Sequence, residues 1–215
     1  MLNLSRLSLL AAFCVLLAAI PAQADLVINE VLGDPNQDWD GDGTLTYRND
    51  EWIEVLNRGP ETIDLGEYWL RDDHGSAPHI QLDGTLEPGA VLVVYGSDAM
   101  AWQTANGQPI IGLSVNNTGD GIDLLRTVPG KAGPLLEVVD RVVVQDHEVE
   151  DDRSSGRQVE SDAWLLFDAL NPYSGSVDPQ GTECAPSPGA PNDCSINVAT
   201  EQARWGALKS RYRNP

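Results

Sequence analysis

The sequence has few of the residues on which common catalytic sites are built. Its 215 residues include 3 cysteines and 3 histidines, and the histidines, His74, His79 and His147, are scattered. Neither an H-E-x-x-H pattern, which holds catalytic zinc, nor a G-x-S-x-G pattern, which presents a catalytic serine, occurs. The sequence therefore lacks the short signatures of zinc proteases and serine hydrolases.

Two short triplets leave one enzymatic alternative open. Residues 72–74 read Asp-Asp-His and residues 146–148 read Asp-His-Glu. Carboxylate and imidazole groups can hold Mg²⁺ or Zn²⁺, so a divalent-metal-dependent extracellular hydrolase is the alternative function. Such triplets more often form exposed turns, and we expect exposed turns here. The sequence predicts that the protein is not an enzyme.

Basic residues are scarce except at the carboxyl end. The chain has 13 lysines and arginines against 33 aspartates and glutamates, a net charge of −20. Residues 196–215 carry four basic residues against one glutamate, a balance of +3, and Arg6 is the one charged residue of the first 24, so residues 25–195 carry −24. A surface this acidic repels phosphate backbones, which argues against nucleic-acid binding by the body, and it is compatible with bound cations.

Only one long apolar run occurs, from Leu7 to Ile20. It follows Arg6 and precedes Ala22-Gln23-Ala24, which is the layout of a secretory signal peptide, so we predict that residues 1–24 are removed by cleavage after Ala24. The run is shorter than the roughly 20 residues of a spanning helix, and a retained anchor is the alternative. We expect a secreted protein, extracellular, periplasmic or at the cell surface, without a membrane span.

The cysteines allow one pair outside the predicted signal peptide. Cys14 lies within that peptide, which leaves Cys184 and Cys194, separated by a spacer rich in proline and glycine. An even pair in an exported chain usually oxidises, so we predict a disulfide. Closing so short a loop stabilises a fold by roughly 2–3 kcal/mol. The alternative is two buried free thiols.

Short β-branched runs, broken by turn residues, fill the first two thirds of the remaining chain. Many short strands without a long helical period predict an all-β fold, a sandwich or barrel. The predicted strands are 26–32, 51–57, 62–70, 79–82, 90–96, 109–115, 121–127 and 135–144.

The strand predicted at 51–57 has apolar side chains on both faces. Ile53 and Val55 share one face, while Trp52, Glu54 and Leu56 share the other. We therefore expect this strand to lie inside a sheet whose back is partly covered. Trp52 and Trp69 are large enough to anchor the core between two sheets.

The chain changes character after Asp146. Residues 147–162 are charged and lack apolar periodicity, which predicts a long loop, and residues 163–168 form either a last strand or a docking segment. The rest of the extension, to residue 195, is irregular and closed by the predicted disulfide. Residues 196–215 carry an apolar stripe at helical spacing with basic residues around it, which predicts a short amphipathic helix. This tail docks on the sandwich or frays, or it recognises a partner, an anionic surface or the export machinery.

Several phrases, taken in order, resemble the lamin tail domain, the immunoglobulin-like sandwich of nuclear lamin tails that also occurs in exported bacterial proteins. The phrases are INE (28–30), EWIEVLN (51–57), IDLGEYWLRDD (63–73), LEPGAVLVV (86–94), NTGDGIDLL (117–125) and SPGAPN (187–192). The resemblance covers about Asp25 to Asp146, with a weaker echo to Asn192. It implies an immunoglobulin-like β-sandwich at 25–146. Tyr68 precedes Trp69 where the family has a Gly-Trp step, which is a departure from its pattern.

The resemblance implies a scaffold or interaction role and brings no catalytic residues. The chromatin and membrane contacts of nuclear lamins do not carry over, because this chain has a signal peptide, an acidic body and no coiled-coil heptads. The expected partner is an extracellular protein, a glycan or a component of the cell envelope, with Trp39 and Trp102 as candidate ligand contacts. The alternative for Trp102 is that it plugs one end of the sandwich.

The segment DWDGDGTLTYRN (38–49) matches the first half of a calcium-binding loop. Asp38, Asp40 and Asp42 occupy positions 1, 3 and 5, a glycine takes position 6, and Thr44 offers its backbone carbonyl at position 7. Position 12 lacks the usual glutamate, so Asp50, or the glutamate after it, has to close the coordination. The predicted ligands of a structural calcium ion are Asp38, Asp40, Asp42, Thr44 and Asp50. The alternative is a hairpin connection held by bonds from side chains to the backbone.

Overall fold

A five-stranded antiparallel sheet forms one layer of the molecule, in the order β11-β10-β1-β2-β7. The computed structural model describes residues 26–73, 77–158 and 161–194. The predicted signal peptide, His74 and the predicted C-terminal helix lie outside these residues. The strands of this sheet are β1 (Leu26–Leu32), β2 (Trp52–Asn57), β7 (Val91–Tyr95), β10 (Ser154–Arg157) and β11 (Trp164–Phe167).

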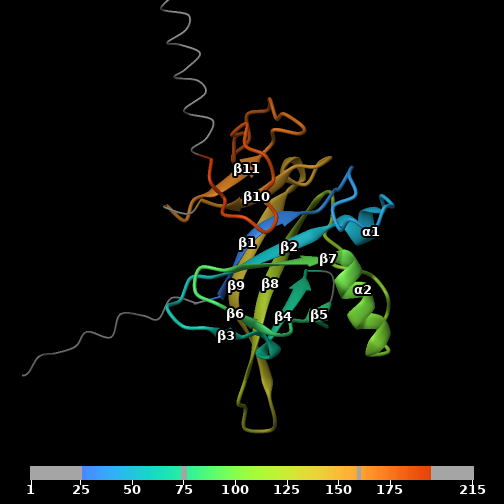
Figure 1. Ribbon diagram of the computed structural model, residues 1–215, viewed down its shortest axis with the longest axis vertical. Helices are drawn as coiled ribbons and strands as arrows, with labels where there is room; N and C mark the ends of the chain where they lie inside the picture. The colour runs from blue at the N-terminus through green and yellow to red at the C-terminus, as the bar shows by residue number, and fades with distance from the viewer. Residues whose placement is uncertain (1–25, 74–76, 159–160, 195–215) are drawn as a thin grey trace, which may run out of the picture.

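A four-stranded sheet in the order β5-β4-β8-β9 forms the second layer, and a two-stranded ribbon pairs β3 with β6. The long β8–β9 hairpin extends beyond the rest of the strands (Figure 1). The strands of these two sheets are β3 (Ile63–Asp64), β4 (Tyr68–Asp72), β5 (Ile80–Gln81), β6 (Thr85–Leu86), β8 (Gly119–Val128) and β9 (Leu135–Gln145).

The buried core is mainly aliphatic and draws on both layers. Such a core is the main source of stability in a sandwich, because each buried aliphatic side chain contributes about 1.5–3 kcal/mol. Its members include Leu26, Ile28, Val31, Ile53, Val55, Leu70, Val94, Ile122, Leu124, Val142 and Val144. The all-β, immunoglobulin-like sandwich predicted from the sequence is confirmed. No described helix is long and apolar enough to cross a membrane.

Most predicted strands are confirmed within two residues of their predicted ends. The run predicted as one strand at 62–70 is instead divided into β3, a short 3₁₀ helix η1 (Leu65–Glu67) and β4. The side chain of Asp64 accepts a hydrogen bond from the backbone N–H of Gly66 at 3.0 Å, which caps η1 and ends β3.

The prediction of a strand at 109–115 is wrong, because this segment is a loop. Gly112 and Ser114 have positive φ values of 73° and 60°. The backbone N–H groups of Ile111 and Gly112 donate to Oε1 of Gln103, at 2.8 and 3.1 Å, so they are not available to a neighbouring strand. A polar side chain of a helix therefore replaces the sheet partner that the apolar sequence predicted.

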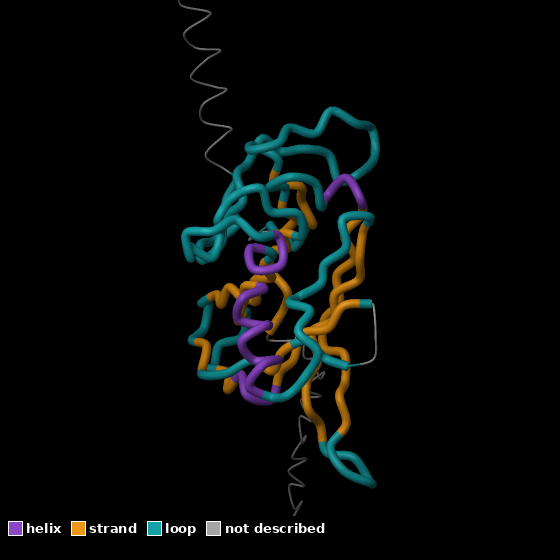
Figure 2. Tube along the Cα trace, turned by 90° about the vertical axis from the view of Figure 1, so that its right-hand side faces the viewer, coloured by secondary structure: helices purple, strands orange, loops and turns teal. Residues whose placement is uncertain are grey.

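That helix, α2 (Gly96–Ala105), was not predicted. Its buried residues are Gly96, Ala99 and Gln103, so it has no stripe of large apolar side chains from which helical periodicity could be read. A Cβ atom on Gly96 would lie 1.8 Å from the backbone oxygen of Arg48, so only glycine permits this contact. Arg48 belongs to the short helix α1 (Tyr47–Asp50), and α1 and α2 lie side by side at one flank of the strands (Figures 1 and 2).

The prediction of a long loop at 147–162 is also wrong. This segment contains the end of a 3₁₀ helix, η2 (Asp146–Glu148), and strand β10, which pairs with β1. The sequence of β10, Ser-Ser-Gly-Arg, lacks the β-branched residues on which strand prediction depends. Residues 163–168 do contain the last strand, β11, and the sheet therefore continues beyond Asp146.

Neither Trp52 nor Trp69 anchors the core, contrary to the sequence prediction. Ile53 and Val55 do face the core, so Trp52 is buried on the opposite face of β2, which we call the outer face of the five-stranded sheet. In β4 the additional Tyr68 takes the core-facing position, and Trp69, which follows it, points away.

Candidate functional site

The loop between β1 and α1 brings three of the predicted metal ligands together. Asp38, Asp40 and Asp42 each offer a carboxylate oxygen, and these oxygens lie within 4.8 Å of one another. Gly41 and Gly43 have positive φ values of 74° and 90°, which let the backbone curl around the three side chains. Within residues 26–73, 77–158 and 161–194, these aspartates are the one group of three or more acidic, histidine or cysteine side chains placed to share an ion.

Bonds from side chains to the backbone hold the three aspartates in place. Asp38 accepts hydrogen bonds from the N–H groups of Gly41 and Gly43, both at 2.9 Å. Asp40 accepts from Asp42 at 3.0 Å, and Asp42 accepts from Thr44 at 2.7 Å. A carboxylate has about four acceptor positions, so each aspartate keeps lone pairs for a cation beside these bonds.

Asp50 plays a different part from the other predicted ligands. It is fully buried, and its carboxylate accepts hydrogen bonds from the backbone N–H groups of Trp39, Asp40 and Thr46 at 2.7, 3.1 and 2.7 Å. These bonds join the beginning and the end of the acidic loop. Asp50 is not a member of the converging group of three aspartates.

Asn49 and Glu51, on either side of Asp50, have different hydrogen-bond partners. Nδ2 of Asn49 lies 3.5 Å from Oδ2 of Asp42, and turning the amide by 180° would place its oxygen there instead. The carboxylate of Glu51 accepts from the N–H of Val115 at 3.3 Å, and burial raises the pKa of Glu51 to about 8. Asn49, at position 12, is therefore better placed than Glu51 to complete the loop.

The two tryptophans predicted as ligand contacts both pack against other tryptophans. Trp39 is partly buried edge-on against Trp52, with ring centroids 6.0 Å apart, and its indole N–H donates to Asp152 at 2.8 Å. Trp102 packs edge-on against Trp69 at 5.8 Å and lies against the core. Both side chains thus have a packing role, and contact with a ligand stays a prediction.

A second constellation, which the sequence analysis did not identify, lies on the outer face of the five-stranded sheet. Glu30 of β1 and Glu54 of β2 are direct partners in the antiparallel register, and both are fully buried. An irregularity in the register between Ile28 and Glu30 accommodates Asn29, which is also buried. Two carboxylates thus lie side by side beneath another part of the chain.

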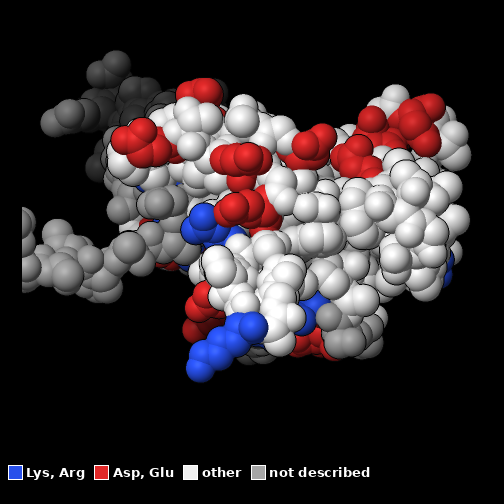
Figure 3. Space-filling model, turned by 90° about the horizontal axis from the view of Figure 1, so that it is seen from below, with Lys and Arg blue, Asp and Glu red and all other residues white. Residues whose placement is uncertain are grey.

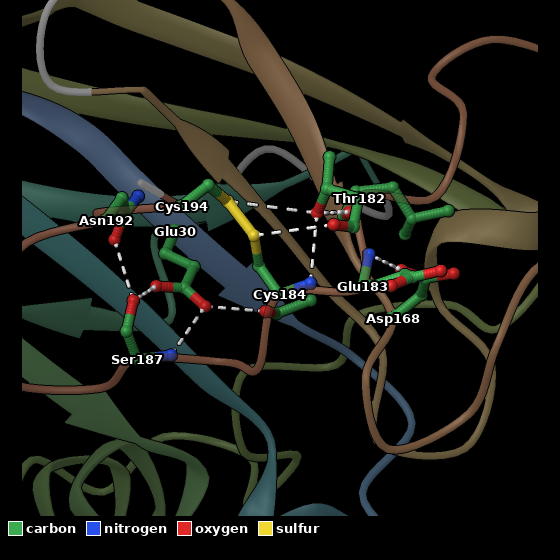
Figure 4. Close-up of a disulfide and its surroundings, with 10 residues drawn as sticks. Glu30, Asp168, Thr182, Glu183, Cys184, Ser187, Asn192 and Cys194 are labelled. Carbon is green, nitrogen blue, oxygen red and sulfur yellow. Dashed lines mark hydrogen bonds between the residues drawn. A yellow bond between two sulfur atoms is a disulfide. The ribbon is translucent and has the colours of Figure 1, made fainter. Parts of the chain in front are cut away.

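The part of the chain that covers them is the segment Cys184–Cys194, which we call the clasp. The predicted disulfide between these two cysteines is confirmed, with Cα atoms 5.7 Å apart. Ser187 donates to Glu30 from its backbone N–H at 3.0 Å and from its hydroxyl at 2.8 Å, as Figure 4 shows. The backbone N–H of Gly189 donates to Glu54 at 2.6 Å.

Side-chain amides complete the attachment of the clasp. Nδ2 of Asn192 donates to the backbone oxygen of Asn29 at 3.0 Å, and its Oδ1 lies 3.1 Å from the hydroxyl oxygen of Ser187. Asn29 donates to Glu54 at 2.6 Å. The phrases INE, EWIEVLN and SPGAPN, far apart in the sequence, therefore meet in one buried hydrogen-bonded network.

Burial perturbs both carboxylates of this network. Desolvation raises the pKa of Glu30 to about 7, although hydrogen bonds from Ser154 and Ser187 favour its charged form. Desolvation also raises the pKa of Glu54, against the hydrogen bonds from Asn29 and Gly189. Near neutral pH the pair therefore resists carrying two full negative charges.

The two triplets considered for metal-assisted hydrolysis are exposed turns only in part: Asp73 and Asp146 are exposed, while the other described members, Asp72, His147 and Glu148, are buried. Nε2 of His79 lies 3.0 Å from Oδ1 of Asp72, in a buried pair formed with a histidine outside the triplet. In the second triplet, Asp146 stays exposed, but His147 and Glu148 are buried in η2, and His147 stacks on Tyr173 with ring centroids 4.6 Å apart. Neither arrangement forms a converging group of metal ligands within the described residues.

Comparison with models of protein families gives a match over most of the chain. The family model described as Lamin Tail Domain matches residues 19–168, which extends beyond Asp146 and includes β10 and β11. No curated protein matches the chain significantly.

Proposed function

Because the chain belongs to the lamin tail domain family, we propose that it is an exported, non-catalytic binding or structural module whose acidic loop binds calcium. An immunoglobulin-like sandwich of this family is typically not an enzyme, which supports the non-catalytic assignment. The apolar run followed by Ala22-Gln23-Ala24 supports export, as does the disulfide, because disulfides persist mainly in oxidising compartments.

The convergence of Asp38, Asp40 and Asp42 carries the calcium proposal. Calcium takes six to eight oxygen ligands in a flexible geometry, and three carboxylates on one loop supply the hard, charged part of such a set. The carbonyl of Thr44 and the amide of Asn49 occupy the positions that would add neutral oxygens. Water would complete the coordination, since the aspartates at the two ends of the set, Asp38 and Asp42, are exposed.

Calcium would act on the structure by removing charge repulsion. Three carboxylates this close repel one another. A divalent ion between them attracts each carboxylate and so offsets the repulsion. The loop connects β1 to the helix before β2, and Trp39 within it packs on Trp52. Holding the loop rigid would therefore stabilise the connection between two central strands and the packing on their outer face.

Calorimetric titration of calcium into the chelator-stripped chain tests the proposal. We expect saturable binding at one site and a rise in melting temperature, both absent in the double variant Asp40→Ala plus Asp42→Ala. Asp64→Ala plus Asp83→Ala is the matched control, because it removes two exposed aspartates that also accept bonds from nearby backbone N–H groups. Absence of binding heat and of any thermal shift in the wild type would reject calcium binding.

The proposed partner is an extracellular protein, a glycan or a component of the cell envelope. The strongly acidic body supports a role outside nucleic-acid binding, and acidic side chains are spread over the face seen in Figure 3 with few basic ones between them. A glycan array with the wild type and Trp102→Ala tests whether Trp102 contacts a ligand or serves only in packing. Loss of a bound glycan in the variant would make Trp102 a contact, and an unchanged pattern would leave it a packing residue.

A further inference from the structure

The outer face of the five-stranded sheet is covered only in part by the described chain. The clasp lies over Glu30 and Glu54 and bonds to both. Further along the same face, Leu56 of β2 and Val91 of β7 lie opposite each other and are only partly buried. Apolar sheet surface thus continues past the edge of the clasp.

A groove of about 700 Å³ marks this boundary. The sheet contributes Leu56, Ala90 and Val91 to its lining, and the clasp contributes Pro191 and Asn192. The wall and the floor are therefore largely apolar, and one side is built from residues that directly precede Cys194. Grooves of this size hold a few side chains and not a whole folded element.

We propose that the C-terminal tail, residues 196–215, places apolar side chains in this groove and extends the cover that the clasp begins. The tail starts two residues after Cys194, and Asn192 in the groove wall lies two residues before that cysteine. Trp205 is the eleventh residue after Cys194, a reach of roughly 16 Å as helix and roughly 36 Å when extended. Any part of the groove is therefore accessible to the apolar residues of the tail.

The apolar pattern of the tail suits the size of the groove. At helical spacing one face of the tail carries Val198, Trp205, Leu208 and Tyr212. Residues three apart are neighbours on a helix, so Trp205 and Leu208 form a compact apolar pair. We assign this pair to the groove, where it covers Leu56 and Val91.

Charge favours the same occupant. The tail carries +3 and the preceding residues of the mature chain carry −24, so the two attract each other in general. Arg58, which lines the groove, is paired with Asp162 at 2.7 Å and so adds little repulsion. A separate basic partner in the groove would complement the acidic body no better than the basic tail of the same chain does.

Limited proteolysis of the full, disulfide-bonded chain tests the proposal, because trypsin cuts at the basic residues of the tail. The sites are Arg204, Lys209, Arg211 and Arg213. We expect mass spectrometry to show these sites cut at least tenfold more slowly than in a synthetic peptide of residues 195–215. Wild-type cleavage at the rate of the peptide would overturn the proposal.

Two variants locate the contact. Trp205→Ala plus Leu208→Ala changes only the tail and should bring cleavage to the rate of the correspondingly substituted peptide, and Val91→Glu in the groove should do the same. Val138→Glu on β9 is the matched control, since Val138 is 46% exposed and lies outside the groove, and it should leave the tail protected. Near-ultraviolet circular dichroism establishes that each variant remains folded.

Other outcomes contradict the proposal directly. Protection that survives Val91→Glu in a folded variant would place the tail elsewhere on the body. Protection that increases with protein concentration would mean that the tail of a second copy occupies the groove. Protection that survives Trp205→Ala plus Leu208→Ala would show that the apolar pair is not what holds the tail.

Discussion

Glu30 and Glu54 lie directly opposite each other on β1 and β2, and neither side chain is exposed to solvent. Together they accept hydrogen bonds from Ser154, from Asn29 and from the clasp. The cost of burying two neighbouring carboxylates is thus offset by donors aimed at them, and part of the cost is relieved when a proton is taken up. Stability of the fold should therefore depend on pH.

The first prediction is that the chain becomes less stable as pH rises from 5 to 8. Burial raises the pKa of Glu30 to about 7, from an unfolded value near 4.5, so its contribution is fully present below about 4.5 and is lost as pH rises through 7. A shift of this size corresponds to roughly 3 kcal/mol. Glu51, whose pKa burial raises to about 8, adds to the same trend. Urea unfolding at pH 5 and pH 8 measures the difference.

The variant Glu30→Gln separates the contribution of Glu30 to the pH dependence of stability from the contribution of Glu51. The amide is neutral and similar in shape, and the Ser187 hydroxyl can accept a bond from it where it now donates. We expect the variant to fold and to lose less stability between pH 5 and pH 8 than the wild type. An identical pH dependence in variant and wild type would show that Glu30 does not take up the proton.

The second prediction concerns the buried pair of His79 and Asp72. Burial opposes a charge on His79, but the hydrogen bond and the negative charge of Asp72 outweigh it, so the pKa of His79 is raised. A raised histidine pKa gives stability that is present below its unfolded value of about 6.5 and is lost as pH rises through the folded value. His79→Gln should therefore destabilise the chain more at pH 5.5 than at pH 9. Nuclear magnetic resonance titration of the imidazole checks the direction of the shift.

The third prediction is that Gly156→Ala destabilises the chain by roughly 1–3 kcal/mol. A Cβ atom on Gly156 would lie 2.5 Å from Nδ2 of Asn192 and 2.9 Å from the backbone oxygen of Asn29. The contact would push the clasp away from β1. Gly66→Ala is the control, because the nearest neighbour of its added Cβ atom would be a side-chain oxygen of Asp64 at 3.3 Å. Equal midpoints of urea unfolding for the two variants would contradict this account.

The sequence predicts the parts of the fold in which local pattern and tertiary environment agree. β1, β8 and β9 are rich in β-branched and aliphatic residues and were predicted nearly to their ends. β10 was missed because Ser154 serves as a donor to Glu30 and Gly156 leaves room for Asn192, and neither residue has a preference for strands. Tertiary contacts selected these residues, and local pattern does not reveal them.

The same reasoning explains why the group of three aspartates could be predicted and the network around Glu30 and Glu54 could not. The spacing of Asp38, Asp40 and Asp42 within one loop is a local property, so their convergence could be predicted from the sequence. The contact between Glu30 and Ser187 spans 157 positions and depends on the register of β1 with β2 and on the path of the clasp. Neither the register nor the path of the clasp can be predicted from a single sequence, although each phrase that contains these residues matches the family pattern by itself.

The last prediction distinguishes the residues proposed to bind calcium from the residue that holds the loop. Asp42 is exposed, and its carboxylate makes one bond to the N–H of Thr44 and a long one to Asn49. Asp42→Ala should therefore change the stability of the calcium-free chain by less than about 1 kcal/mol, as is usual for exposed positions, while removing most of the stabilisation by calcium.

Asp50→Asn should behave in the opposite way. The carboxylate of Asp50 is buried and accepts from three backbone N–H groups, and an amide would direct its own donor at one of them. The calcium-free chain should lose roughly 1–3 kcal/mol, because a buried donor is left without an acceptor. Thermal unfolding of both variants, with calcium and with chelator, measures the two effects. If Asp50→Asn abolished the calcium response without destabilising the calcium-free chain, Asp50 would be a ligand and not the residue that holds the loop.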